Sequence, residues 1–156
     1  MVPAVFRAAQ RDDLPGVLRL LGQLHRDEPA PALAEAEAVF GAISATPGLT
    51  LFVLERNGAI VATTYLNVIP NLTRGLSPYA VIENVVVDEA QRGTGLGKRI
   101  MANTLQTAWD AGCYKAMLET GSRTPATHAF YRACGFSPDE KTGYVAHPPL
   151  WHAHPA

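Results

Sequence analysis

Residues 91–99 read QRGTGLGKR, a stretch with three glycines in five positions and basic residues at both ends. It follows a valine run typical of a strand buried on both faces, and it precedes a segment with helical spacing. A strand, a glycine turn and a helix N-terminus leave backbone N–H groups unpaired, and the helix dipole favours an anion there. A plain turn needs fewer glycines, so we expect this segment to approach a phosphate.

Two familiar phosphate-binding patterns do not fit this stretch. A P-loop reads GxxxxGK[ST], but Gly93 and Gly97 are one residue too close, and Arg99 stands where the magnesium-binding hydroxyl belongs. The dinucleotide pattern GxGxxG starts well at Gly93, but Lys98 replaces the third glycine. The expected phosphate ligand is therefore held by another kind of loop.

Hydrophobic spacing and turn residues predict a mixed α/β order for the rest of the chain. Asp12 and Asp13 are expected to cap the first helix, and Asn57-Gly58 is the strongest signal for a β-hairpin. A right-handed crossover makes the fourth and fifth strands parallel. The expected strands are 2–9, 49–55, 59–68, 80–87, 113–120 and a strand-like segment at 143–146; the helices are 14–27, 32–43, 97–112 and 124–136, and 70–79 is a loop.

Length and composition place limits on the kind of protein. The 156 residues predict one domain, 1–156, with a core at about 3–146 and a Pro/His-rich tail at 147–156. A formal net charge of −1 gives no reason to expect a nucleic-acid or membrane partner. No secretory signal pattern and no membrane-spanning run is seen, and Cys113 and Cys134 are expected to be reduced thiols. We therefore expect a cytoplasmic protein.

Two segments together resemble the GNAT acetyltransferase superfamily. Arg92, Gly95 and Gly97 form the pattern RxxGxG after the strand ENVVV, and residues 126–136 read ATHAFYRACGF in the expected order. The resemblance covers about 3–146 and implies a single-domain α/β (α+β) fold: a mixed central sheet flanked by helices, whose fourth and fifth strands splay apart. ENVVV and GCYKAMLETGS also resemble small-molecule N-acetyltransferases, including those acting on glucosamine phosphate.

The resemblance implies acetyl-CoA as the ligand of the glycine stretch. Backbone amides of residues 92–98 would hold the pyrophosphate, and the valine backbone would pair with the pantetheine arm in the gap between the splayed strands. The residues so implied are Val85, Val86, Val87, Arg92, Gly93, Thr94, Gly95, Leu96, Gly97 and Lys98. We expect the valine side chains themselves to lie in the core. No metal is expected, because His147, His152 and His154 are irregularly spaced, as in a solvated tail.

Tyr131 and Glu83 are the expected catalytic residues. Tyr131 stands where the family places a tyrosine near the coenzyme sulfur, where it would protonate the departing thiolate. Glu83 is a carboxylate on an otherwise apolar strand, where partial burial would raise its pKa toward that of a useful base. Tyr131 could instead be a packing residue and Glu83 an ion-pair partner. Glu119, His128 and a water chain remain alternative bases.

These observations predict an N-acetyltransferase that joins acetyl-CoA and a primary amine of a small molecule by direct attack in a ternary complex. A protein lysine or N-terminal acetyltransferase and a non-catalytic acyl-CoA sensor are the alternatives. Homodimers are common in the family, and Trp151 could anchor the tail on a second subunit. The acceptor is expected at the N-terminal helices and the loop 69–79, with these polar or aromatic candidates: Arg26, Asp27, Glu28, Arg74 and Tyr79.

Overall fold

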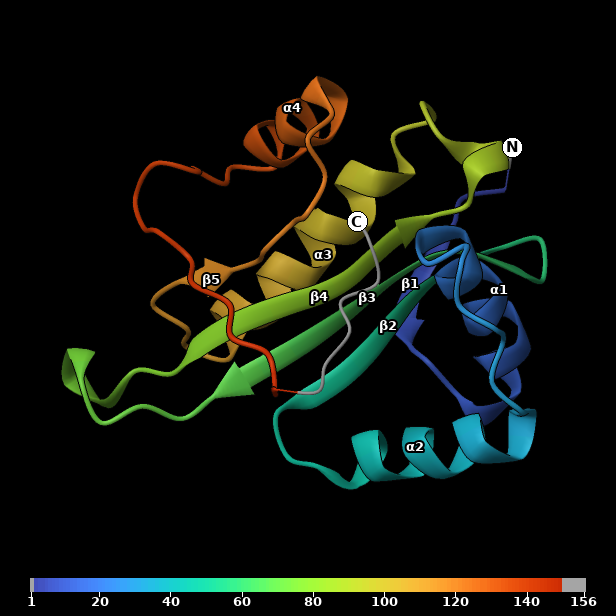
Figure 1. Ribbon diagram of the computed structural model, residues 1–156, viewed down its shortest axis with the longest axis horizontal. Coiled ribbons are helices and arrows are strands. Elements are labelled where there is room, and N and C mark those ends of the chain that lie inside the picture. Colours follow the sequence, from blue (N-terminus) through green and yellow to red (C-terminus); the bar gives the residue numbers. More distant parts are fainter. Residues whose placement is uncertain (1, 150–156) are drawn as a thin grey trace. The chain divides into compact units, whose positions relative to one another are not determined.

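A five-stranded mixed sheet, in the order β1-β2-β3-β4-β5, organises the computed structural model, which describes residues 2–149 (Figure 1). The first four strands pair antiparallel, whereas β4 and β5 pair parallel. The mixed sheet and its one parallel pair are therefore as the sequence predicted. The strands are β1 (Val5–Ala8), β2 (Leu49–Arg56), β3 (Ala59–Ile69), β4 (Tyr79–Val87) and β5 (Ala116–Met117).

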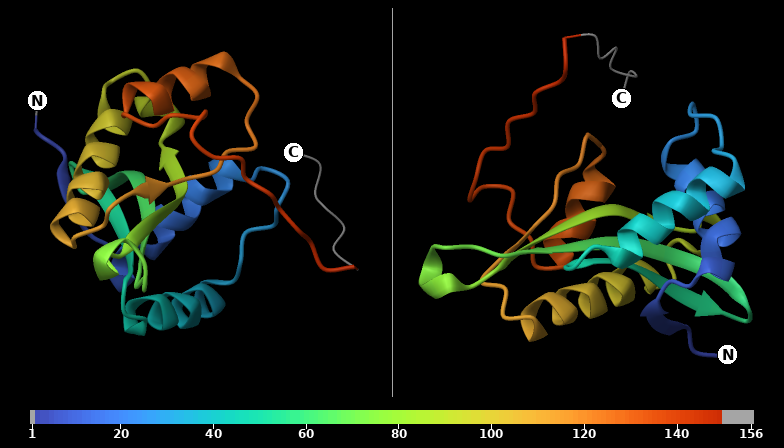
Figure 2. Two further views of the ribbon diagram at one scale, coloured as in Figure 1. Left: turned by 90° about the vertical axis from the view of Figure 1, so that its left-hand side faces the viewer. Right: turned by 90° about the horizontal axis from the view of Figure 1, so that it is seen from below.

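Helices cover both faces of this sheet. Figure 2 shows α3 (Leu96–Asp110) on one face and α1 (Leu14–Leu24) and α2 (Leu33–Ala45) on the other. The chain divides into two compact units, Met1–Leu118 and Glu119–Ala156. The sheet and these three helices belong to the first unit, and α4 (Pro125–Ala133) belongs to the second. Short 3-10 turns lie at Arg11–Asp13, Arg74–Leu76 and Glu89–Gln91.

The predicted hairpin is confirmed at Asn57 and Gly58. Both residues have left-handed backbone, with φ of 53° and 75°. This pair of positive φ values matches the right-handed twist of the flanking strands, so β2 and β3 run together from Arg56↔Ala59 to Leu49↔Asn67.

Three local expectations were wrong. Residues 113–120 were expected to form one strand, but the ladder with β4 is limited to Ala116 and Met117. Residues 143–146 were expected to be strand-like, but they are not a strand, and none of the five strands within residues 2–149 pairs with them. Asp13 does lie at the N-cap position of α1, but its side chain makes no capping hydrogen bond to that helix. It instead accepts hydrogen bonds from Arg7 at 2.6 and 2.9 Å and from the backbone N–H of Gln10 at 2.7 Å.

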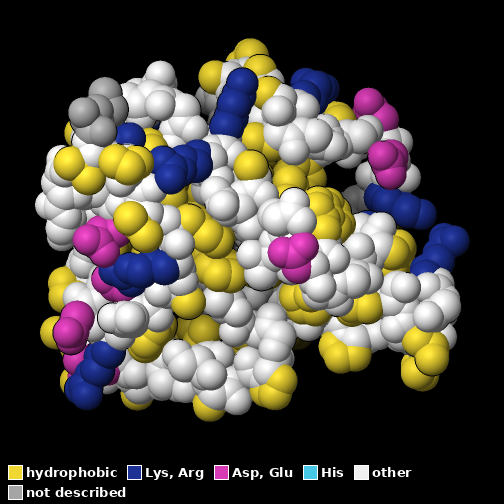
Figure 3. Space-filling model, turned by 180° about the vertical axis from the view of Figure 1, so that it is seen from behind, with side chains coloured by type: hydrophobic (Ala, Val, Ile, Leu, Met, Phe, Trp, Pro, Cys, Tyr) yellow, Lys and Arg dark blue, Asp and Glu magenta, His cyan; other side chains and the backbone are white. Residues whose placement is uncertain are grey.

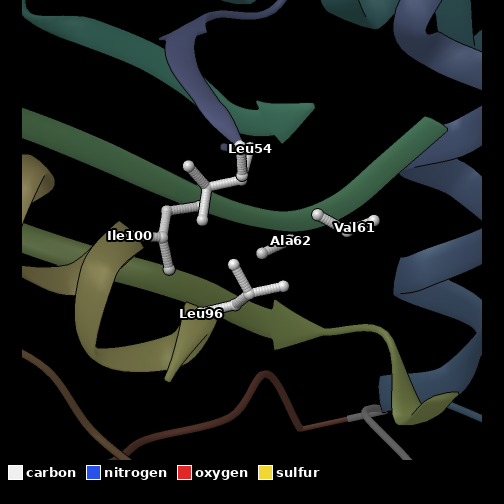
Figure 4. Packing of buried hydrophobic residues seen from close by; sticks show 6 residues of the cluster. Leu54, Val61, Ala62, Leu96 and Ile100 are labelled. Atoms are coloured by element: carbon white, nitrogen blue, oxygen red, sulfur yellow. The ribbon is translucent and has the colours of Figure 1, made fainter. Parts of the chain in front are cut away.

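The core lies on both faces of the sheet. On the α3 side, Leu96 and Ile100 pack with Leu54 and Ala62 (Figure 4). On the α1 side, the cluster consists of Val17, Leu20, Val53, Ile60 and Val86. Val86 belongs to this second cluster and Val87 packs against the first, so β4 is covered on both faces, as its valine run predicted. Leu96, the first residue of α3, fixes the helix N-terminus to the core.

The surface carries both signs of charge. On the face drawn in Figure 3, acidic and basic side chains are interspersed with apolar ones. Ion pairs link separate elements, such as Arg11 with Glu37 at 2.7 Å and Arg19 with Asp88 at 2.7 Å. Within residues 2–149, no helix has the length and apolarity needed to cross a membrane.

Candidate active site

The edge of β4 is open over most of its length. Its pairing with β5 consists of Ala80↔Ala116 and Val81↔Met117, and within residues 2–149 no strand pairs with this edge from Ile82 onward. The predicted splay of the two strands is confirmed by this short ladder. Unpaired N–H and C=O groups at such an edge can pair with an extended ligand that contains amide groups.

A β-bulge interrupts the other side of β4. Tyr65 pairs with Glu83 and Thr63 pairs with Val86, so three steps on β4 oppose two on β3. The extra residue falls beside Asn84, which has a left-handed φ of 50°. Asparagine tolerates this backbone better than most side chains, and bulges of this kind often re-aim groups next to active sites.

The glycine stretch forms a tight loop at the N-terminus of the 15-residue helix α3. Gly93 and Gly95 have left-handed φ of 76° and 83°, and a Cβ added to either would meet nothing within 4 Å. Among the described residues, none accepts a hydrogen bond from the backbone N–H groups of residues 93–98. A row of unpaired donors at the positive end of a helix dipole fits a pyrophosphate. The loop thus matches the phosphate site predicted from its glycines.

Side chains of α1, and of Arg26 just after it, hold the start of this loop. Asp88 accepts from Arg19 at 2.7 Å and from the backbone N–H of Ala90 at 3.1 Å. Gln23 accepts from the backbone N–H of Glu89 at 2.9 Å, and Arg26 donates to the Glu89 carboxylate. These contacts fix the chain between β4 and the glycines.

The structure places Glu83 on β4, one residue before Asn84, and leaves it exposed to solvent. The expected partial burial is wrong, because Glu83 lies at the bulge in the part of β4 from which β5 has already departed. Val85, Val86 and Val87 follow it, with Val86 buried and the other two half-buried. Glu83 and the valine backbone therefore lie on one continuous stretch of the open strand.

Tyr131 lies on α4, in the second unit. It is half-buried, with its ring 5.2 Å from that of Phe130 and 6.2 Å from that of Phe136, measured between ring centroids. Gly135 ends this segment with a left-handed φ of 95°, as its sequence predicted. Contacts with these two aromatic rings fix the position of the Tyr131 ring. Its phenol group can donate a proton.

The two alternative bases have other surroundings. Glu119 was expected to end the fifth strand, but it lies beyond β5, and a Cβ added at Gly143 would be 3.0 Å from its Oε1. The Nε2 of His128 donates to the backbone carbonyl of Ser122 at 2.8 Å. His128 thus stabilises the turn before α4.

Within residues 2–149, no group of acidic, histidine or cysteine side chains could hold a metal ion. His147 lies among the described residues; His152, His154 and Trp151 lie outside them.

Most of the acceptor candidates contact other side chains of the first unit. Arg26 pairs with Glu89, and the Nδ1 of His25 is 3.9 Å from Glu28 Oε1. Arg74 lies over the ring of Tyr114, and Lys115 lies over the ring of Tyr79. A cavity of about 260 Å³ lies between the sheet and the helices α1 and α2. Among the described residues that line it, none is one of the five acceptor candidates.

Sequence reasoning missed Tyr65 and Asn84, which both line this cavity. Burial raises the pKa of the Tyr65 phenol, so its hydroxyl stays protonated and able to donate. The one available signal was Asn84 itself, a turn-forming residue within the apolar strand AVIENVVV.

The profile of the Acetyltransferase (GNAT) family matches residues 16–136. The chain belongs to the GNAT acetyltransferase family. It is therefore an acyltransferase, as predicted, and GNAT acetyltransferases use acetyl-CoA as a co-substrate.

Relatives of this GNAT chain include enzymes named for small-molecule acceptors. Glucosamine 6-phosphate N-acetyltransferase of Trypanosoma brucei brucei is 30% identical over 141 residues, which cover 90% of this chain and 94% of that protein. Glucosamine 6-phosphate N-acetyltransferase 1 of Oryza sativa subsp. japonica is 33% identical over 126 residues, or 78% and 73% of the two chains. A solved structure from Agrobacterium tumefaciens str. C58 has a TM-score of 0.88 at 49% identity, covering 92% of this chain and 99% of its own.

Proposed function

We propose that this chain transfers the acetyl group of acetyl-CoA to a primary amine of a small molecule, by direct attack in a ternary complex. The observation that carries the proposal is the row of unpaired N–H groups at residues 93–98, next along the chain from the open edge of β4. Family membership and the relatives named for glucosamine 6-phosphate support a small-molecule acceptor.

The glycine loop is proposed to hold the pyrophosphate of acetyl-CoA. The site consists of the backbone amides of Arg92, Gly93, Thr94, Gly95, Leu96, Gly97 and Lys98, of which the Arg92 N–H also donates to the Glu89 carbonyl at 3.4 Å. Only the backbone of Leu96 takes part, since its side chain is core. Arg92 and Lys98 are exposed and add positive charge. The bare Cα atoms of the glycines let the phosphate oxygens approach the amides closely.

The open edge of β4 is proposed to hold the pantetheine arm. Val85, Val86 and Val87 would pair their backbone with the amides of the arm, as an added strand does. Their side chains remain in the core, so the proposal concerns only N–H and C=O groups. An N–H group at this edge would also polarise the thioester carbonyl and stabilise the oxyanion.

Glu83 and Tyr131 are proposed to move the protons. Acetyl-CoA supplies an acetyl group whose carbonyl carbon gains a bond to the amine nitrogen as its bond to sulfur breaks. Glu83 accepts the proton that the amine loses, directly or through water, and its exposed position lets solvent carry that proton away. Tyr131 donates its phenolic proton to the thiolate and regains one from solvent.

We further propose that the protein works in the cytoplasm. Burial raises the pKa of the Cys113 thiol, which keeps it protonated and unreactive. A protonated thiol is the usual state of a cysteine in a reducing compartment.

The test is to incubate the protein with acetyl-CoA and a panel of primary amines, and to follow both the free thiol and the acetylated amine by mass spectrometry. We expect one free thiol for each acetylated amine. Glu83→Gln should slow product formation, whereas the exposed control Glu140→Gln should not. Release of thiol without any acetylated amine would contradict the proposal.

A further inference from the structure

A cavity of about 260 Å³ lies within the first unit, between the sheet and the two N-terminal helices. The α1 wall consists of Leu14, Val17, Leu18 and Leu21. Their spacing of three, one and three residues places them on a single face of the helix. This wall is firm, because Leu14 and Val17 are buried in the core.

The α2 wall has the same kind of spacing: Ala36, Val39, Phe40 and Ile43. It is packed differently, because no residue of α2 is fully buried and Val39 is 60% exposed. Two apolar helix faces therefore point into one space without closing it. Apolar surface left in such a concave site is typical of a small-molecule pocket.

The floor of the cavity leads to the proposed base. Leu51 and Tyr65 line the cavity and pair with each other across β2 and β3. Tyr65 pairs in turn with Glu83 across β3 and β4. Residues that pair directly share one face of a sheet, so Leu51, Tyr65 and Glu83 form a row running from the cavity to the carboxylate.

The polar groups at the cavity are few and carry no positive charge. They are the Tyr65 hydroxyl, the Asn84 amide and the exposed carboxylate of Glu35. Within the described chain, no lysine, arginine or histidine lines the cavity. A phosphate group binds through cationic side chains and backbone N–H groups, whereas a carboxylate at the mouth attracts an ammonium group.

We propose that the acceptor is an alkylamine or arylalkylamine whose apolar body fills this cavity, with its amino group directed along the row toward Glu83. This inference rests on the proposed acetyl transfer and names the class of acceptor. Carbon groups of the amine would lie against the leucine face of α1 and the ring of Phe40. The carboxylates of Glu35 and Glu83 would attract the cationic form before the proton is lost.

The first test compares amines that differ only in their apolar part. Propylamine, butylamine, pentylamine and hexylamine would be assayed with acetyl-CoA for free thiol and acetylated product, beside phenethylamine and glucosamine 6-phosphate. We expect kcat/KM to rise about three- to fourfold for each added methylene, the factor given by burying one such group. Phenethylamine should exceed glucosamine 6-phosphate by at least 100-fold.

The second test fills the cavity. Ala36→Phe adds a ring on the cavity side of α2, and Ala42→Phe makes the same change at an exposed position of the same helix that does not line the cavity. We expect Ala36→Phe to lower kcat/KM for hexylamine at least tenfold and to leave the thermal shift caused by acetyl-CoA unchanged. Ala42→Phe should behave like the unmodified protein.

The outcomes separate this inference from the proposed function. A kcat/KM that stays flat along the alkylamine series, or the best turnover with glucosamine 6-phosphate, would overturn the apolar acceptor and leave acetyl transfer standing. Unchanged hexylamine turnover in Ala36→Phe would also overturn it, because the acceptor would then not occupy the cavity. Acetyl transfer itself would fail if no amine became acetylated, whether or not acetyl-CoA caused a thermal shift.

Discussion

Tyr65 and Glu83 face each other across β3 and β4, immediately before the bulge at Asn84. One member of the pair lines the cavity under the N-terminal helices, and the other lies on the strand whose far edge is open. This relationship connects the proposed acceptor pocket to the proposed coenzyme edge through a single residue pair. The bulge sets the register in which the residues from Glu83 to Val86 pair with β3.

The left-handed backbone at Asn84 should make the bulge sensitive to side-chain shape. Asn84→Val should lower the free energy of unfolding by about 1–2 kcal/mol, because a β-branched side chain clashes with a positive φ. Asn84→Gly should stay within about 0.5 kcal/mol of the unmodified protein, because glycine adopts this backbone freely. Urea denaturation measures both variants, and equal stability of the valine variant would contradict the strain.

Gly95 should be required for acetyl-CoA binding. Gly95→Glu places a negative side chain at the helix N-terminus where the pyrophosphate is proposed to lie, so binding measured by calorimetry should become undetectable. Gly95→Ala imposes similar strain at φ 83° without the charge and should weaken binding much less. Gly41→Glu, at an exposed position of α2 with no neighbour within 4 Å, is the control. Unchanged affinity in Gly95→Glu would remove the loop from the coenzyme site.

Tyr131→Phe should separate chemistry from packing. The phenylalanine ring keeps the contacts with Phe130 and Phe136 and loses only the hydroxyl. If that hydroxyl protonates the thiolate, kcat should fall about 100-fold, a typical effect of losing a general acid. The KM for acetyl-CoA and the melting temperature should change little. Undiminished turnover would return Tyr131 to a packing role.

Asp13 should stabilise the fold in a pH-dependent way. Hydrogen bonds from Arg7, and then from the backbone of Gln10, hold the pKa of the Asp13 carboxyl below its ordinary value of 3.8. Asp13→Asn should therefore lower the free energy of unfolding by about 2 kcal/mol at neutral pH, where the carboxylate is charged.

The sign of this pH dependence follows from the lowered pKa. The stabilisation is complete above pH 3.8, the value for the unfolded chain, and is lost as the pH falls through the lower pKa of the folded state. The difference between Asp13→Asn and the unmodified protein should shrink over that acidic range. Exposed Asp12→Asn serves as the control, and a difference that grows on acidification would contradict the account.

Most of the fold could be predicted because its signals are local. Asn57 and Gly58 specify a hairpin by their backbone preference, and the run Val85–Val86–Val87 specifies a strand covered on both faces. The glycines at 93 and 95 likewise specify a loop with left-handed backbone before a helix. In each case the amino acid itself limits the conformation.

The remaining features depend on partners far along the chain. The ladder between β5 and β4 ends after two residue pairs. The residues of β5 alone do not predict where this pairing stops. The cavity arises because α2 lies over the sheet without burying any residue, which the spacing of its cavity-lining residues does not predict. The exposure of Glu83 follows from the same departure of β5. These are packing outcomes, and spacing within one segment does not determine them.

Thermal melting with and without acetyl-CoA, beside ATP and NADH as controls, tests the central claim most directly. A ligand at 100 times its Kd stabilises the folded state by about 2.7 kcal/mol, which should raise the melting temperature by roughly 5–10 °C. We expect this rise with acetyl-CoA alone, and we expect no rise in Gly95→Glu. No rise with acetyl-CoA, or an equal rise with ATP, would contradict a coenzyme site at QRGTGLGKR.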